Sequence, residues 1–206
     1  MSERARPLTE PVQPRARQSY EALLDAAQCI LEESGYEALN SNAVAARAGM
    51  TPPTFYRYFA DKQMLLAILA QRLLDAQNAL VPLHLDAGKA SFTGGVDAIE
   101  ALMTADIELT RAFKASFELM VLLRSLPELR QLRIAAHQQM SGALARELAA
   151  TYPEIAPTTL RARLRLGTEV YYSTMEMLFE TGFKQQREIV RRAAVAIQAL
   201  VILPDP

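Results

Sequence analysis

Apolar residues recur at intervals of three and four along most of the chain, and this periodicity constrains the fold more than any other feature. Such spacing places apolar side chains on one face of an α-helix. The clearest run lies between positions 18 and 34, where one helical face carries Tyr20, Leu23, Leu24, Ala27, Ile30 and Leu31. The chain has no alternating pattern typical of strands and no internal repeat. The sequence therefore predicts an all-α protein.

Glycine, proline and capping residues divide the periodic sequence into segments. Gly35 follows the first segment at a position that favours left-handed backbone, and Asn40, Thr51 and Asp61 are predicted to cap the helices after them. We expect nine helices, at about 18–34, 41–47, 52–58, 62–81, 96–110, 111–124, 127–151, 157–181 and 185–202. A loop is expected over 82–95.

Composition limits the class of protein. The chain has 206 residues, half of them apolar, which is enough for a sizeable core. Its apolar runs are too short to cross a bilayer and its N-terminus lacks a signal peptide, so we expect a cytoplasmic protein without membrane contact. The net charge is −1. Any binding of nucleic acid must therefore depend on where the charges lie.

No pattern in the chain indicates an enzyme. A Ser/His/Asp arrangement, a glycine-rich phosphate loop and metal-ligand spacing are all missing from the sequence. We expect no catalytic residue, no metal and no cofactor. The single cysteine, Cys29, is expected to be a small buried apolar residue, and His84 and His137 are expected at the surface.

The segments 41–47 and 52–58 form a candidate helix-turn-helix. The turn between them contains Gly49, and Ala45 and Ala48 are small enough to let two helices cross closely. Phe55 and Phe59 are four residues apart and are predicted to point together into a core.

The opposite face of segment 52–58 carries Pro53, Tyr56 and Arg57. These residues suit a DNA major groove, where Arg57 can donate two hydrogen bonds to guanine and Pro53 can contact a thymine methyl group. A hairpin with an ordinary solvated face would show the same pattern, so the pattern alone does not decide between the two.

Further residues are predicted to contact the DNA backbone. Thr54, Tyr58 and Lys62 flank the exposed face, and Ser41 opens the helix that crosses the backbone. Thr51, directly before segment 52–58, is also predicted to contact DNA. Arginines in the first 17 residues, a flexible basic arm, can reach a minor groove or can simply be solvated.

Residues 35–66, GYEALNSNAVAARAGMTPPTFYRYFADKQMLL, resemble the N-terminal domain of the TetR/AcrR family, and the likeness extends over about residues 18–70. The matching positions are Gly35, Tyr36, Val44, Ala45, Ala48, Gly49, Thr51, Thr54, Tyr56, Phe59, Lys62, Leu65 and Leu66. The resemblance implies phosphate contacts by Thr54, Tyr56 and Lys62 and base contacts by Pro53 and Arg57. Asn42 departs from the family, which often has a base-reading residue there.

The resemblance also implies a domain plan. The basic arm would span 1–17, the helix-turn-helix domain 18–78, and a regulatory and dimerisation domain 79–206. The last two helices would pair with those of a second copy to form a homodimer. Apolar and aromatic side chains suggest a pocket for a small apolar or aromatic effector, and the candidates are Phe113, Phe117, Met120, Tyr171 and Met175.

The sequence thus predicts a ligand-responsive transcriptional regulator that binds a palindromic, double-stranded DNA operator. A repressor that its effector releases from DNA is favoured, because most members of the family repress. The alternative is a helical ligand-binding or scaffold protein that no longer binds DNA. The near-neutral charge favours this alternative, whereas Tyr56, Arg57 and Lys62 speak against it.

Overall fold

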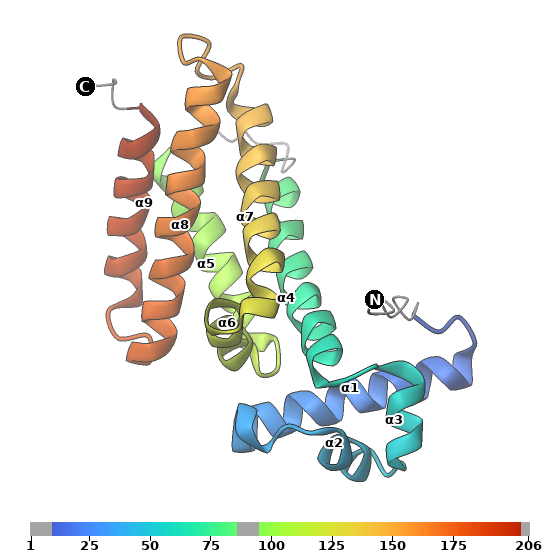
Figure 1. The fold of residues 1–206 in the computed structure, drawn as a ribbon. Helices are drawn as coiled ribbons and strands as arrows, with labels where there is room; N and C mark the ends of the chain where they lie inside the picture. The colour runs from blue at the N-terminus through green and yellow to red at the C-terminus, as the bar shows by residue number, and fades with distance from the viewer. Residues whose placement is uncertain (1–9, 86–94, 203–206) are drawn as a thin grey trace. The chain divides into compact units, whose positions relative to one another are not determined.

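The computed structural model describes residues 10–85 and 95–202, and within these ranges the chain forms only helices and turns. The predicted all-α fold is confirmed. The helices are α1 (Pro14–Ser34), the 3₁₀ turn η1 (Tyr36–Ala38), α2 (Ser41–Arg47), α3 (Pro52–Tyr58), α4 (Lys62–Leu85), α5 (Val96–Ala112), α6 (Ser116–Ser125), α7 (Pro127–Leu148), α8 (Pro157–Thr181) and α9 (Gln186–Ile202) (Figure 1).

Helix α1 begins four residues earlier than the sequence pattern predicts. Pro14 occupies its first turn, where the missing amide hydrogen costs no helical hydrogen bond, and the amide of Arg17 already donates to the Gln13 carbonyl (2.9 Å). The last four residues of the predicted flexible arm, including Arg15 and Arg17, are therefore helical. Residues 1–9 of that arm lie outside the described residues.

Several other boundaries differ from the prediction, some of them by one or two residues and three by more. α4 runs through Pro82 to Leu85, into the predicted loop, of which residues 86–94 lie outside the described residues. α6 begins at residue 116 instead of 111, because Ala115 adopts a left-handed conformation (φ 57°) that separates it from α5. α7 ends at residue 148 instead of 151. In contrast, α2, α3 and α8 have the predicted bounds.

Two of the three predicted caps are confirmed. The side chains of Asn40 and Asp61 accept hydrogen bonds from the amides of Ala43 (2.9 Å) and Met64 (2.8 Å). The predicted side-chain cap by Thr51 is wrong, because the residue two positions into α3 is a proline and the Thr54 amide donates to the Thr51 carbonyl instead (2.9 Å). The Thr51 hydroxyl lies 3.2 Å from that of Thr54.

The chain divides into two compact units. Unit 1 contains residues 1–72 and 114–129, and unit 2 contains residues 73–113 and 130–206. These units differ from the division at 78/79 expected from sequence, since residues 114–129, with α6, group with the N-terminal helices. The contacts of Lys114 show the reason: its carbonyl accepts from Gln28 (2.9 Å) and its ammonium pairs with Asp25 (3.0 Å), both on α1.

An aromatic core holds unit 1 together. Phe55 and Phe59 are fully buried, as predicted, and the ring of Tyr20 stacks on Phe59 with centroids 5.1 Å apart. Offset and edge-to-face aromatic pairs of this kind add to the free energy gained by burying their surface. The core therefore fixes α3 against α1.

In unit 2, α9 packs against both α8 and α5, and Figure 1 shows α8 and α9 side by side along most of their lengths. Gly167 permits this approach, because a Cβ atom at that position would lie 3.2 Å from the Cγ2 atom of Ile197 on α9. Met103, Ile107, Met175 and other apolar side chains fill the interior between the helices.

The expectation that every apolar stretch of the chain is too short to cross a membrane needs correction. Judged by length and composition alone, the stretch Lys62–Val81 of α4 is apolar enough to cross a bilayer. In the structure, however, several of its leucines are buried within the protein, among them Leu65, Leu69 and Leu73. We therefore interpret this stretch as a core helix.

Two single-residue expectations are also wrong. His137 is only 2% exposed instead of lying at the surface, because Tyr172 stacks on its ring (centroids 4.2 Å apart) and Glu169 accepts at its Nδ1 atom (3.0 Å). Cys29 is only partly buried, and its Sγ atom lies 2.8 Å from the Lys114 Nζ atom. The side chain of His84 lies outside the described part of the structure.

Candidate DNA-binding surface

The helix-turn-helix consists of α2, a turn and α3. Gly49 adopts a positive φ of 67° in the turn, which is strained for other residues, and the amide of Met50 closes the turn on the Ala45 carbonyl (2.8 Å). Arg47 of α2 forms a bidentate pair with Glu33 of α1 (2.6 and 2.5 Å). Backbone and side-chain contacts therefore fix α2 and its turn on α1.

The outward face of α3 carries the residues that the sequence singled out. Pro53, Tyr56 and Arg57 are all exposed, with 54% of Tyr56 accessible, while Phe55 on the same helix is fully buried. An exposed, rigid aromatic ring next to an arginine is unusual for a surface without a partner. This face is therefore accessible to a partner as large as a DNA duplex.

A hydrogen bond joins the two helices of the motif at this surface. The Tyr56 hydroxyl lies 2.8 Å from the Ser41 hydroxyl at the start of α2. Each hydroxyl keeps further capacity to donate or accept. The structure thus brings two of the predicted phosphate-binding residues together.

Tyr58 does not occupy the flanking position predicted for it. Its ring is buried (7% exposed) and packs edge-on to Tyr20, with centroids 6.0 Å apart. Its hydroxyl accepts a hydrogen bond from Arg57 (2.9 Å), whose guanidinium lies over the ring at 4.9 Å from the centroid. Tyr58 therefore positions Arg57, and its burial argues against a direct phosphate contact.

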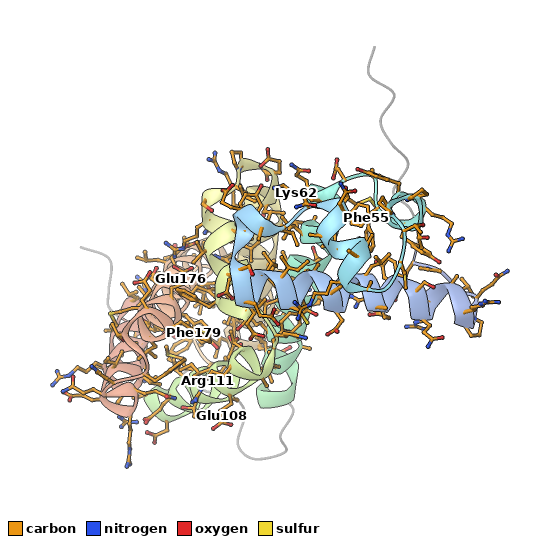
Figure 2. All side chains as sticks on the ribbon, turned by 90° about the horizontal axis from the view of Figure 1, so that it is seen from below. Phe55, Lys62, Glu108, Arg111, Glu176 and Phe179 are labelled. Carbon is orange, nitrogen blue, oxygen red and sulfur yellow. The ribbon has the colours of Figure 1, made fainter. Side chains whose placement is uncertain are left out.

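Lys62 opens α4 beside the motif (Figure 2). Its Nζ atom lies 4.1 Å from the centre of the Tyr36 ring, a cation–π contact that orients the charge without neutralising it. The Asp61 carboxylate next to it is engaged in capping the helix. Lys62 therefore keeps a positive charge at the edge of the surface.

An open hollow with a volume of about 810 Å³ lies between the start of α1 and the helix-turn-helix. Arg15 and Ser19 of α1 line one side, and Thr51, Thr54 and Arg57 line the other. From the sequence, Arg15 was expected to lie in a flexible arm that can reach a minor groove, so its place on α1 next to this motif was not predicted. Pro14 at a helix start is the signal that would have revealed the connection.

Ion pairs elsewhere in unit 1 engage acidic side chains away from α3. Glu21 binds Arg72 through two short contacts (2.6 and 2.8 Å), and the hydrogen bond from Arg72 lowers the pKa of Glu21. Glu33 is paired with Arg47. Both acidic side chains are therefore paired with arginines outside α3.

The five candidate pocket residues are divided between the two units. Tyr171 lines a small apolar cavity in unit 2, with a volume of about 40 Å³, but the other four are not part of its lining. Phe117 and Met120 belong to unit 1, whereas Phe113, Tyr171 and Met175 belong to unit 2, and Met175 is fully buried core. Helical periodicity places a residue on a face of its own helix but does not identify the helix that packs there.

The cavity itself is formed by four helices. Its walls come from α5, α7, α8 and α9 and consist of Ile99, Leu102, Met140, Leu144, Leu148, Leu164, Gly167, Thr168, Tyr171, Ile197 and Val201. Within the described ranges, no group of three or more His, Cys, Asp or Glu side chains is arranged to hold a metal ion.

Comparison with known sequences places the N-terminal helices in a family. Residues 23–69 match the sequence model described as bacterial regulatory proteins of the tetR family. The TetC protein of transposon Tn10 from Escherichia coli is 26% identical over 90 residues, which cover 44% of this chain and 43% of TetC. The match thus spans less than half of that relative.

Solved structures agree in fold over nearly the whole chain. The fatty acid degradation regulator FadR from Bacillus halodurans superposes with a TM-score of 0.67 at 17% identity, over 95% of this chain and 100% of its own. FadR from Thermus thermophilus, a TetR-family repressor in complex with lauroyl-CoA, gives a TM-score of 0.59 at 16% identity, over 90% and 96%. At this identity the likeness shows the fold alone. Together with the match over 23–69, it shows a tetR-type N-terminal segment in a chain whose fold resembles that of TetR-family regulators.

Proposed function

We propose that the protein is a ligand-responsive transcriptional repressor that binds a palindromic DNA operator as a homodimer in the cytoplasm. The observation that carries this proposal is the exposed face of α3, where Pro53, Tyr56 and Arg57 stand on a fully buried aromatic base. Helix-turn-helix proteins place such a helix, which its buried inner face holds at the surface, in the major groove of DNA.

Each residue of the surface has a proposed role. Arg57 and Pro53 read base edges, because they project from the centre of the exposed face. Tyr56, Thr54, Lys62, Ser41 and Thr51 bind phosphates or position the residues that do. Tyr58 orients Arg57, and Arg15 adds a phosphate contact from α1.

Dimerisation is proposed through α8 and α9. Leu166 and Met177 on α8 are exposed although apolar, and they are eleven residues apart, which returns to the same face of a helix after three turns. Val195 and Ile202 on α9 are likewise exposed and two turns apart. Exposed apolar side chains aligned on adjacent helices favour pairing with a second copy.

The proposed regulation follows from thermodynamic linkage. An effector that binds the dimer better when its two α3 helices are wrongly spaced for DNA must weaken operator binding to the same degree. We propose a small apolar or aromatic effector bound in the C-terminal helices. The lauroyl-CoA complex of the Thermus thermophilus repressor is consistent with an apolar effector for this fold.

The test is recovery of genomic DNA fragments by the purified protein, followed by sequencing and by fluorescence anisotropy on the recovered motif. We expect a shared inverted repeat, bound by the native protein and lost in the variant Arg57→Ala. The control Arg130→Ala removes an exposed arginine of α7 and should bind normally. If no common motif were recovered, the alternative of a helical ligand-binding protein without DNA contact would replace this proposal.

A further inference from the structure

A buried carboxylate lies in the middle of unit 2. Asp106 of α5 is 1% exposed, and its two oxygens accept hydrogen bonds from the hydroxyls of Tyr171 (2.8 Å) and Thr110 (3.2 Å). The Thr110 hydroxyl in turn accepts from the side-chain amide of Gln77 on α4 (2.9 Å). Both of these donors to Asp106 are therefore neutral hydroxyls.

Within the described residues, no cation compensates this carboxylate. Burial raises the pKa of Asp106 to about 6, and only the two hydroxyls act against that rise. Arg111, on the same helix, directs its guanidinium over the ring of Phe183, 4.6 Å from the ring centre. A buried carboxylate without a counter-ion is costly, so a cation that reached Asp106 would be strongly favoured.

The carboxylate adjoins the apolar cavity. Tyr171 belongs to both features, since its side chain lines the cavity and its hydroxyl donates to Asp106. Leu102, one helical turn before Asp106, also lines the cavity. The cavity and the carboxylate thus share the side chain of Tyr171.

A second polar group in this region has no partner. The buried hydroxyl of Tyr172 makes no hydrogen bond within the described structure. Its ring packs edge-on to that of Tyr171, the donor to Asp106, with centroids 5.3 Å apart, and burial, followed by the charge of Asp106, raises the pKa of Tyr172. Buried polar groups are almost always satisfied in proteins, and a bound ligand is one way to satisfy this one.

We propose that the cavity is the effector site and that its ligand is a small primary amine with an apolar body, whose ammonium group binds Asp106. An ammonium group donates three hydrogen bonds and accepts none, which suits a carboxylate and a phenolic oxygen as partners. The apolar body would contact Leu144, Leu148 and Ile197, and the cavity volume of about 40 Å³ limits it to a short chain unless side chains such as Met140 move. This proposal rests on the proposed function, because it names the effector class of that regulator.

The test is calorimetric titration of the full-length protein, without DNA, at pH 7.5. The probes are linear primary amines from propylamine to octylamine, each compared with the alcohol and the carboxylate of equal chain length. We expect an amine of suitable length to bind about tenfold more tightly than its alcohol, and the carboxylate not to bind, because only the ammonium gains a charged hydrogen bond.

Two variants separate the charge from the shape of the site. Asp106→Asn should abolish the preference for amine over alcohol without changing the binding of the alcohol. Tyr172→Phe should weaken amine binding alone. Asp97→Asn, which neutralises an exposed carboxylate on the same helix, is the matched control. Thermal unfolding of each variant confirms that it is folded.

The outcomes are distinct. Equal binding of amine and alcohol, no binding of any amine, or an amine preference that survives in Asp106→Asn would overturn the proposal, leaving only a proton or a water molecule at Asp106. Because these titrations contain no DNA, failure to find an operator would leave their result intact. Conversely, operator binding without amine binding would overturn only the effector class.

Discussion

At the scale of single residues, the pair Arg57 and Tyr58 connects the core of unit 1 with its outer surface. The tyrosine ring is fixed inside, and its hydroxyl holds one of the five N–H donors of the guanidinium. The remaining donors point away with a restricted set of orientations. A base-reading arginine that is held before DNA arrives loses less conformational freedom on binding.

Removing the Tyr58 hydroxyl should therefore weaken DNA binding without unfolding the domain. We expect Tyr58→Phe to lower operator affinity by about 1 kcal/mol, the value of one hydrogen bond, and Arg57→Ala to lower it by about 1–3 kcal/mol. Fluorescence anisotropy at constant salt measures both. Tyr152→Phe, in unit 2, is the control, and unchanged affinity in Tyr58→Phe would show that the hydroxyl does not position Arg57.

Asp106 predicts a pH dependence of stability. Its pKa rises from 3.8 to about 6 on folding, so the folded state holds its proton more tightly than the unfolded state. The group therefore favours the folded state fully below pH 4, and that contribution is lost as the pH rises from about 4 to 6. Relative to Asp106→Asn, the native protein should lose about 3 kcal/mol of unfolding free energy between pH 4 and pH 7.

Urea unfolding of both proteins at several pH values measures this difference. The buried His137 acts in the opposite direction, since burial lowers its pKa, but it is present in both proteins and its effect cancels in the comparison. A pH-independent difference between the two proteins would contradict a raised pKa at Asp106.

At the scale of helices, the residues at a helix start determine whether the polar side chain before it caps the helix or remains available at the surface. Asn40 and Asp61 cap α2 and α4 with their side chains, whereas consecutive prolines at the start of α3 leave Thr51 no amide at the second helical position to accept from. The Thr51 hydroxyl is therefore directed to Thr54 on the edge of the candidate surface.

Two alanine substitutions test this difference. Asn40→Ala should destabilise unit 1 by about 1 kcal/mol, as expected for a lost cap, while Thr51→Ala should cost clearly less. Urea unfolding followed by circular dichroism compares the two variants directly. Equal losses would mean that Thr51 caps α3 after all.

The sequence was most informative about individual helices and least informative about their partners. It predicted the bounds of α2, α3 and α8 because glycine, proline and capping residues mark them locally. It misplaced Tyr58 and His137 because their burial depends on Tyr20, Tyr172 and Glu169, which lie more than thirty residues away in the chain. The residues of the exposed α3 face were found because a short helix with a fully aromatic inner side leaves few choices outside.

At the scale of the whole molecule, the proposed operator binding requires two copies of α3 at a fixed separation. The apolar residues exposed on α8 and α9 are the proposed means of pairing. A charge introduced among them would have to be desolvated in a dimer but would be harmless in a monomer. Dimerisation and DNA binding are therefore expected to fail together.

The variant Leu166→Glu should convert the dimer into a monomer and reduce operator affinity at least about a hundredfold, since each monomer would bind one half-site alone. Analytical ultracentrifugation and anisotropy measure the two effects. Gln139→Glu adds the same charge to an exposed position of α7 and should change neither. Full operator affinity in a demonstrated monomer would contradict the proposed dimer.

The two prolines that open α3 have a thermodynamic consequence for recognition. Each pyrrolidine ring fixes one backbone angle, so the recognition helix is preorganised before it meets DNA. A helix that forms only in the complex gives binding the heat-capacity signature of coupled folding. For this protein the heat-capacity change of DNA binding should therefore reflect only the surface buried in the groove and any bending of the DNA. Any conformational change on binding would then occur in the duplex and not in the recognition helix.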